Sequence, residues 1–168
     1  MSLQKRAVFT GKGKEMQIRR YQITDCAETL TLFTNTVRRV NAADYTQAQI
    51  NAWLHGGMDA AHWGQSLLQH YALVATIGES LVGFGDIDDT GYLDRLFVHH
   101  LFGRRGIATA LVNELELYAR NHDILRVTTH ASITAKPFFE QRGYTVVKAQ
   151  QVVRKGITLQ NYVMQKIL

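Results

Sequence analysis

Cysteine and proline are almost absent from this chain of 168 residues, which contains only Cys26 and Pro137 of these two types. A lone cysteine cannot form an internal disulfide. This excludes a disulfide-stapled secreted scaffold and leads us to expect a cytoplasmic protein with Cys26 as a packed thiol. Long apolar runs are also lacking, because no stretch approaches the ~18 residues of a membrane span, and no secretory signal pattern opens the chain.

Acidic residues are scarce at one end of the chain. The first twenty residues carry six lysines or arginines and one acid, whereas the remaining 13 basic and 13 acidic residues balance. The net charge of +5 therefore does not indicate a basic face on the folded domain, and we expect no nucleic-acid partner. Residues 1–14 show no hydrophobic periodicity, so we expect them to form a tail and residues 15–168 to form one domain.

Hydrophobic periodicity divides the domain into strands and helices. Thr24 and Thr46 are the expected N-caps of two helices. The expected strands are 16–23, 70–77, 81–87, 92–98, 125–130, 144–153 and 158–167; the expected helices are 24–40, 46–55, 59–68, 107–121 and a short one between residues 132 and 143. An antiparallel meander followed by a strand–helix–strand crossover predicts an α/β protein with a mixed sheet.

Residues 92–121 form the stretch on which the functional argument depends. A strand is followed by a short loop with two glycines and two arginines, and then by an amphipathic helix. Free N–H groups at a helix start, together with the helix dipole, make such a turn an anion site. On the helix, the expected buried face is Ile107, Ala108, Leu111, Val112, Leu115 and Tyr118, and the expected exposed face is Thr109, Asn113, Glu116 and Arg120.

The loop sequence distinguishes between kinds of phosphate site. It matches neither the Walker pattern nor the dinucleotide fingerprint. Instead, 103–108 (GRRGIA) resembles the acetyl-CoA loop of the GNAT N-acetyltransferases, Arg/Gln-x-x-Gly-x-Gly/Ala. Downstream, 131–144 (ASITAKPFFEQRGY) resembles the second motif of that family, with Ser132 at its Asn position and Phe139 at its Tyr position. The two motifs occur in the order and spacing of the family, and the resemblance is to a bacterial subgroup of mostly unassigned substrate.

The resemblance implies a GNAT-like acyl-CoA N-acyltransferase fold, with a central splayed, mostly antiparallel sheet flanked by helices. It also implies direct transfer of the acetyl group from acetyl-CoA, as co-substrate, to a primary amine of an unidentified acceptor. The residues implied to bind the cofactor are Leu96, Phe97 and Val98 on the strand edge, Arg104, Arg105, Gly106, Ile107, Ala108 and Thr109 at the turn, and Ser132 and Phe139 in the second motif. Gly103 departs from the pattern, since most relatives carry Arg or Gln there.

An amine must lose a proton before it can attack, so we looked for a base. Asp86, Asp88, Asp89 and Asp94 could form an acidic rim, in which Asp94 is the best candidate for the catalytic base. Two other interpretations of Asp94 are equally open: a salt bridge with a nearby arginine such as Arg95, or a solvated strand residue. Asp88 and Asp89 are better explained as turn formers.

Several other residues have candidate roles. Tyr45 and Trp53 lie on the helices that shape the acceptor side in the family, where they bind substrate or simply pack. Phe139 cannot donate a proton to the departing sulfur, so we expect unassisted thiolate departure, with Tyr162 ahead of Tyr45 as the alternative acid. His130 has a possible role near the second motif. The histidines show no metal-ligand spacing.

Two further questions stay open at this point. The alternative function is a GNAT-fold module that binds acyl-CoA without turnover. We expect a small-molecule or protein amine as acceptor, no membrane partner, and a monomer or homodimer.

Overall fold

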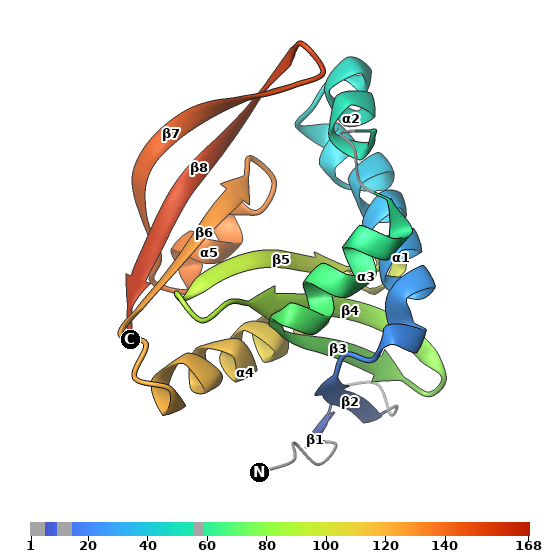
Figure 1. Cartoon of the computed structure of the whole chain (residues 1–168), viewed down its shortest axis with the longest axis vertical. Coiled ribbons are helices and arrows are strands. Elements are labelled where there is room, and N and C mark those ends of the chain that lie inside the picture. Colours follow the sequence, from blue (N-terminus) through green and yellow to red (C-terminus); the bar gives the residue numbers. More distant parts are fainter. Residues whose placement is uncertain (1–5, 10–14, 56–58) are drawn as a thin grey trace.

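The computed structural model describes residues 6–9, 15–55 and 59–168 (Figure 1). In chain order, its strands, helices and 3₁₀ turns are β1 (Arg6–Phe9), β2 (Glu15–Arg20), η1 (Ile23–Asp25), α1 (Cys26–Arg39), η2 (Asn41–Ala43), α2 (Gln47–Leu54), α3 (Ala60–Gln69), β3 (Tyr71–Ile77), β4 (Ser80–Ile87), β5 (Tyr92–Val98), η3 (His100–Phe102), α4 (Ile107–Asn121), β6 (Arg126–Ser132), α5 (Lys136–Gln141), β7 (Thr145–Arg154) and β8 (Ile157–Ile167). None of the described helices combines the length and apolarity needed to cross a bilayer.

The strands form one sheet in the order β1-β2-β3-β4-β5-β6-β8-β7. In the described part of the chain, β5 and β6 are the one parallel pair. Helices α1, α2 and α3 cover one face of the sheet, and α4 and α5 lie against the other (Figure 1). This confirms the predicted α/β fold with a mixed, mostly antiparallel sheet flanked by helices.

Helix α4 packs closely on β4 because two strand positions carry no side chain. A Cβ atom at Gly83 would lie 2.8 Å from Cγ2 of Ile107, and one at Gly85 would lie 3.3 Å from Cδ1 of Leu115. Larger residues at these positions would push the helix away from the sheet. The glycines therefore fix the height of α4, and with it the position of its N-terminus.

The structure corrects the predicted boundaries near the N-terminus. The first domain strand ends at Arg20 rather than at residue 23, because a 3₁₀ turn intervenes before α1. Asp25, not Thr24, precedes α1, and its buried carboxylate accepts hydrogen bonds from the Arg19 guanidinium at 2.7 and 2.8 Å. Within the expected N-terminal tail, Arg6–Phe9 forms β1 and pairs with β2 in antiparallel register.

Helix α4 also departs from its predicted faces. Glu116, expected to be exposed, is buried, whereas Ala108 and Tyr118 are only half-buried. Both carboxylate oxygens of Glu116 accept from Nζ of Lys166 at 3.0 Å, and the Tyr144 hydroxyl donates to Oε1 at 3.1 Å. Helical periodicity cannot reveal such a buried acid, because its partners come from β8 and from the loop after α5.

Candidate active site

Strands β5 and β6 are joined over a short distance and then separate. Their pairing is limited to Tyr92 with Thr128 and Leu93 with Thr129. Beyond this point the N–H of His99 donates to the carbonyl of Val82 on β4. Because backbone groups alternate along a strand, the N–H and C=O groups of Leu96 and Val98 face away from β4, into the gap beside β6. The outer half of β5 therefore presents an open backbone edge.

The loop that follows β5 leads to the N-terminus of α4. Arg104 and Gly106 both have positive φ angles, of 58° and 79°, and no side chain caps the first helical N–H groups. A Cβ atom added at Gly103 or Gly106 would meet nothing within 4 Å. The turn thus offers open space, backbone donors and the positive end of a helix, which are the requirements of a phosphate site.

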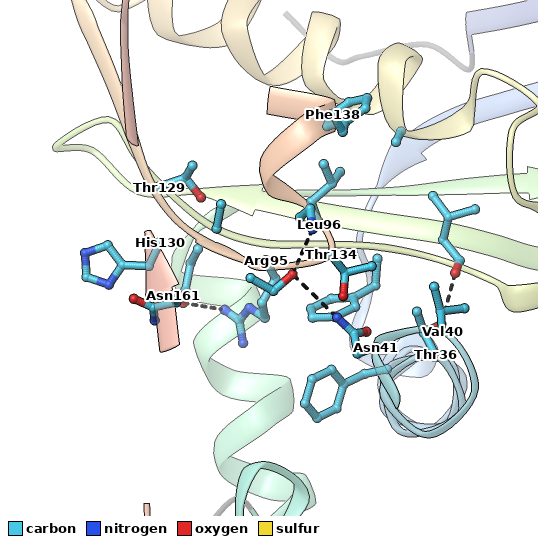
Figure 2. Close-up of a pocket in the computed structure, with 18 of the residues that line it drawn as sticks. Thr36, Val40, Asn41, Arg95, Leu96, Thr129, His130, Thr134, Phe138 and Asn161 are labelled. Carbon is cyan, nitrogen blue, oxygen red and sulfur yellow. Dashed lines mark hydrogen bonds and ion pairs between the residues drawn. The ribbon is translucent and has the colours of Figure 1, made fainter. Parts of the chain in front are cut away.

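A cleft of about 910 Å³ runs along this open edge and continues to the opposite side of the sheet. Its wall on the α4–α5 side includes Leu96, Ala108, Ala135 and Phe138, whereas α1, α2 and the β7–β8 hairpin contribute to the other wall. Figure 2 shows Leu96 and Phe138 near α5, and Asn41 with Thr36 on the opposite side. The α4–α5 wall is therefore mostly apolar, whereas the opposite wall combines aromatic side chains of α1 and α2 with polar groups.

Asp94 enters the cleft because β5 is bulged at that position. On the neighbouring strand Asp86 pairs with Arg95 and Ile87 with Leu93, which leaves Asp94 as the extra residue. A bulge of this kind interrupts the alternation of side chains and redirects one of them. Leu93 consequently packs in the core beside α4, while Asp94 lines the cleft with its side chain 37% exposed.

Beside Asp94 lies a buried charged network. The guanidinium of Arg95 donates two hydrogen bonds to Asp86, at 2.9 and 2.7 Å, and Nδ1 of His70 lies 2.6 Å from Asp86 Oδ2. Arg95 also lies 3.5 Å from Asp94. Desolvation and the charge of Asp86 raise the pKa of Asp94, against smaller opposing effects of Arg95 and His70. Asp94 is therefore a carboxylate in the cleft whose proton affinity is increased, which suits a general base.

Comparison with known proteins gives the same result as the geometry. Residues 41–166 match the family profile described as "Acetyltransferase (GNAT) domain". The chain belongs to the GNAT family of acetyltransferases. It is 36% identical over 150 residues to the "Uncharacterized N-acetyltransferase YafP" of Escherichia coli K12, an alignment that covers 89% of this chain and 95% of that protein.

Solved structures extend the comparison. A GCN5-related N-acetyltransferase from Rhodopseudomonas palustris superposes with a TM-score of 0.86 at 32% identity, covering 90% of this chain and 94% of that one. The PaiA N-acetyltransferase of Thermoplasma acidophilum, solved in complex with coenzyme A, gives a TM-score of 0.76 at 16% identity, with 91% and 99% coverage. The second likeness shows the shared GNAT fold. The sequence-based assignment to the family is thus confirmed.

In this GNAT domain most of the predicted cofactor residues line one cleft. Arg105 is the exception, because its guanidinium lies 4.9 Å from the ring centre of Phe102 and it does not line the cleft. Phe139 is buried and packs edge-on against Tyr144, with ring centres 5.0 Å apart. Ser132 lines the cleft, and its Oγ accepts from the N–H of Ala135 at 3.0 Å. The cofactor residues therefore lie together, although their roles remain predictions.

The predicted acidic rim is reduced to one residue. Asp86 is fully buried and paired, and it does not line the cleft. Asp88 forms the β4–β5 turn by accepting from Thr90 and Tyr92; these hydrogen bonds outweigh desolvation and lower its pKa. Asp89 is also absent from the cleft lining. Only Asp94 of the four predicted carboxylates reaches the cleft, and it lies near Arg95, so the base and salt-bridge interpretations of Asp94 both apply.

The predicted tyrosines differ in their placement. Tyr45 and Trp53 both line the cleft, with ring centres 5.5 Å apart. The Tyr45 hydroxyl is already committed, because it donates to the carbonyl of Gln160 and accepts from the N–H of Ile133. Tyr162 does not line the cleft; its hydroxyl accepts from Gln160 Nε2 at 2.9 Å. The structure thus does not bring Tyr162 to the position expected of an acid.

Several cleft residues were missed by sequence analysis. Thr36 Oγ1 donates to the carbonyl of Val98 at 2.9 Å, and Asn41 Nδ2 lies 3.5 Å from Ser132 Oγ. Both are buried polar residues at or just after α1 (Figure 2). In the sequence, Thr36 stands beside the apolar residues of its helix, which indicates a polar group near the core. This position does not predict which strand the side chain contacts.

One group of side chains has the spacing of metal ligands. His70, Asp86 and Asp94 each place a ligand atom within 4.8 Å of the others, the one such group among the described residues. Arg95 already contacts both carboxylates and supplies positive charge at that place. These residues therefore form an ion-pair network around Arg95.

Proposed function

We propose that this GNAT enzyme transfers the acetyl group of acetyl-CoA directly to a primary amine, as a cytoplasmic enzyme with a small-molecule or protein acceptor. The observation that carries the proposal is the open backbone edge of β5, which has the uncapped N-terminus of α4 at one end and Asp94 on the opposite side of the sheet. This arrangement fits a long amide-containing thioester with a diphosphate at one end.

The residues present fit the cofactor in two places. The backbone groups of Leu96 and the N–H of Val98 are positioned to pair with pantetheine amides, as an added strand would. The carbonyl of Val98 already accepts from Thr36 Oγ1. The N–H groups at the start of α4, with the Arg104 side chain nearby, are positioned for the diphosphate. When bound, acetyl-CoA supplies the activated acetyl thioester, and the chain itself supplies orientation and proton transfer.

Asp94 is positioned to remove the proton that keeps the acceptor amine from attacking. An amine with a pKa of about 10.4 is about 0.1% neutral near pH 7.4, a cost of roughly 4 kcal/mol. A carboxylate in the cleft that accepts the ammonium proton, directly or through water, lowers this cost. Desolvation and the charge of Asp86 raise the pKa of Asp94, which makes its carboxylate a stronger base.

The departing sulfur needs less help. A thiol with a pKa of about 8.5 leaves as thiolate near pH 7.4 at a cost of only ~1.5 kcal/mol. Phe139 has no proton to give, and in the GNAT cleft it forms a buried wall. We therefore assign Phe139 to packing and no residue to protonation of the sulfur.

The test is thiol release from acetyl-CoA, measured across a panel of amines with amide formation confirmed by mass spectrometry. Amine-dependent release with stoichiometric amide supports transferase activity. Tight acetyl-CoA binding by calorimetry, with no release above the no-enzyme rate for any amine, would instead support a binding module without turnover.

A further inference from the structure

The charges that line the cleft are unequal. Among the described lining residues, Asp94 is the single carboxylate, whereas three arginines are present: Arg95, Arg104 and Arg154. A polyamine or other polycation carries two or more ammonium groups, and each needs an acidic partner or open solvent. This cleft offers one such partner. Its lining is therefore unsuited to a polycationic acceptor.

Two of the three arginines are already accounted for. The guanidinium of Arg95 is bound in bidentate fashion to the buried carboxylate of Asp86. Arg104 lies at the turn before α4, beside the expected phosphate position. Arg154 remains, at the end of β7, exposed and without an ion pair among the described residues. Arg154 is thus a cation in the cleft for which the described part of the chain supplies no counter-charge.

Arg154 lies on the acceptor side of the cleft. Gln150, Val152 and Arg154 alternate along β7, and all three line the cleft. The amide of Gln150 lies 3.4 Å from His130 Nδ1, and the His130 ring packs edge-on against Tyr92 at 5.1 Å between ring centres. Tyr92, His130 and Gln150 thus form a polar stretch of the cleft wall, and Val152 separates Gln150 from Arg154 along β7.

The pKa of the Tyr92 phenol depends on the charges of both Asp94 and Arg154. Its pKa is raised to about 12, chiefly by desolvation, then by Asp94 and other acids, and Arg154 acts in the opposite direction. Tyr92, Asp94 and Arg154 also line the same cleft. A small molecule lying across Tyr92 can place one group at each charge.

The wall formed by α1, α2 and β5 has a different character. Phe97 and Trp53 are half-buried and line the cleft. The Phe33 ring lies between them, 4.9 Å from Phe97 and 6.4 Å from Trp53, centre to centre. This aromatic wall suits the apolar body of an acceptor.

We infer that the acceptor is a monoamine that also carries a carboxylate or another anionic group, with the amine at Asp94, the anion at Arg154 and an apolar body against Trp53 and Phe97. The inference rests on the proposed function. In the reaction, the amine nitrogen forms a bond to the acetyl carbon while the carbon–sulfur bond breaks. The electron pair of that bond leaves with the CoA sulfur as thiolate. Asp94 takes the ammonium proton before the attack, and the second proton, lost as the nitrogen becomes a neutral amide, passes to solvent.

The experiment compares amines that differ only in the anionic group. Phenylalanine is compared with phenylethylamine, and 4-aminobutyrate with butylamine. The two carboxylate-bearing amines differ in the spacing between amine and carboxylate. Spermidine is the polycationic probe. Because charge-assisted contacts with a carboxylate are strong, kcat/KM of the preferred pair should favour its carboxylate-bearing member by roughly tenfold or more. Spermidine should be the poorest acceptor.

Two variants test the assignment to Arg154. Arg154→Gln should reduce the preference for the carboxylate-bearing amine to within about twofold. Lys155→Gln is the matched control, because Lys155 is the next residue of the same hairpin, is exposed and does not line the cleft. It should retain the wild-type preference, which separates a contact with Arg154 from a general effect of positive charge.

The possible outcomes separate this inference from the proposed function. Acetylation of amines without preference for the anionic member, or a preference that survives Arg154→Gln, overturns the inference and leaves the transferase function standing. If no amine is acetylated, binding of the products N-acetylphenylalanine and N-acetylphenylethylamine to the CoA complex is measured by calorimetry. Preferential binding of the anionic product that is lost in Arg154→Gln supports the site without turnover, and equal binding overturns it.

Discussion

Arg104 and Arg105 are adjacent in the sequence, yet their side chains have different surroundings. Arg104 lines the cleft at the start of α4, whereas Arg105 packs over Phe102. Arg104→Glu should weaken acetyl-CoA binding roughly tenfold or more, because a charge-assisted contact with phosphate becomes a repulsion. Arg105→Glu is the matched control and should change the Kd by less than about threefold, since exposed charges are screened. Titration calorimetry measures both, and equal effects would show that the loop acts only through its total charge.

Asp94 provides a second prediction at the scale of one residue. Asp94→Asn should lower kcat by roughly 10²–10⁴-fold with little change in acetyl-CoA affinity, because a general base is lost. Wild-type kcat/KM should rise with pH through the raised pKa of Asp94. In the variant the rise should shift to the pKa of the free amine, about 10. Identical pH–rate profiles would exclude Asp94 from the mechanism.

The fold of the Asp94 variant can be checked independently through linkage. Folding raises the pKa of Asp94, so its favourable contribution to stability exists below the unfolded pKa near 4 and is lost as the pH rises through the folded pKa. Above the folded pKa the ionised carboxylate therefore does not stabilise the fold, and there Asp94→Asn should not lower the melting temperature. A large decrease would attribute the loss of activity to unfolding.

At the scale of single elements, α4 depends on a buried acid. Glu116 joins α4 to β8 through Lys166 and to the loop after α5 through Tyr144. Glu116→Gln should reduce the free energy of unfolding by about 2–4 kcal/mol, because it leaves a half-buried ammonium without its counter-charge.

The matched control for Glu116 is Glu140→Gln. Glu140 is exposed on α5 and pairs with Lys136 at 2.8 Å, so its loss should cost about 0.5 kcal/mol or less. Urea unfolding with a shared m-value measures both variants. Similar costs for the two would mean that the network around Glu116 adds no more than a surface pair.

How far the sequence predicts these elements depends on the range of the interactions. Strand β5 and helix α4 were predicted with their observed bounds, because periodicity and the glycine-containing turn are local signals. The environment of Glu116 is set by Lys166, fifty residues away, and could not be predicted locally. The bulge that exposes Asp94 arises from register with β4, and the approach of Thr36 to Val98 requires α1 to cross β5. The sequence motifs predicted the cofactor end of the cleft, whereas tertiary contacts determine the end that contains Asp94.

At the scale of the whole molecule, the N-terminal segment and the cleft lie in different parts of the sheet. Strand β1 is at one edge, and β2, β3 and β4 separate it from β5, where the cleft begins (Figure 1). Arg19 and Arg20, the two cations of the first twenty residues whose side chains the structure describes, do not line the cleft. Changes at the β1 edge of the sheet should therefore affect the melting temperature but not acetyl-CoA affinity.

Deletion of residues 1–14 tests that separation. It removes β1, which pairs with β2 over four residues, but it retains the buried Met16 and Ile18 of β2. We expect the melting temperature to fall by only a few degrees, since about 1 kcal/mol corresponds to roughly 2–4 °C in a chain of this size. Acetyl-CoA affinity should not change. Ile18→Ala in the full chain is the control for damage to this edge, and its cavity should cost about 2–5 kcal/mol. If the deletion destabilises the protein as much as Ile18→Ala, or weakens acetyl-CoA binding, then the N-terminal segment is an integral part of the domain.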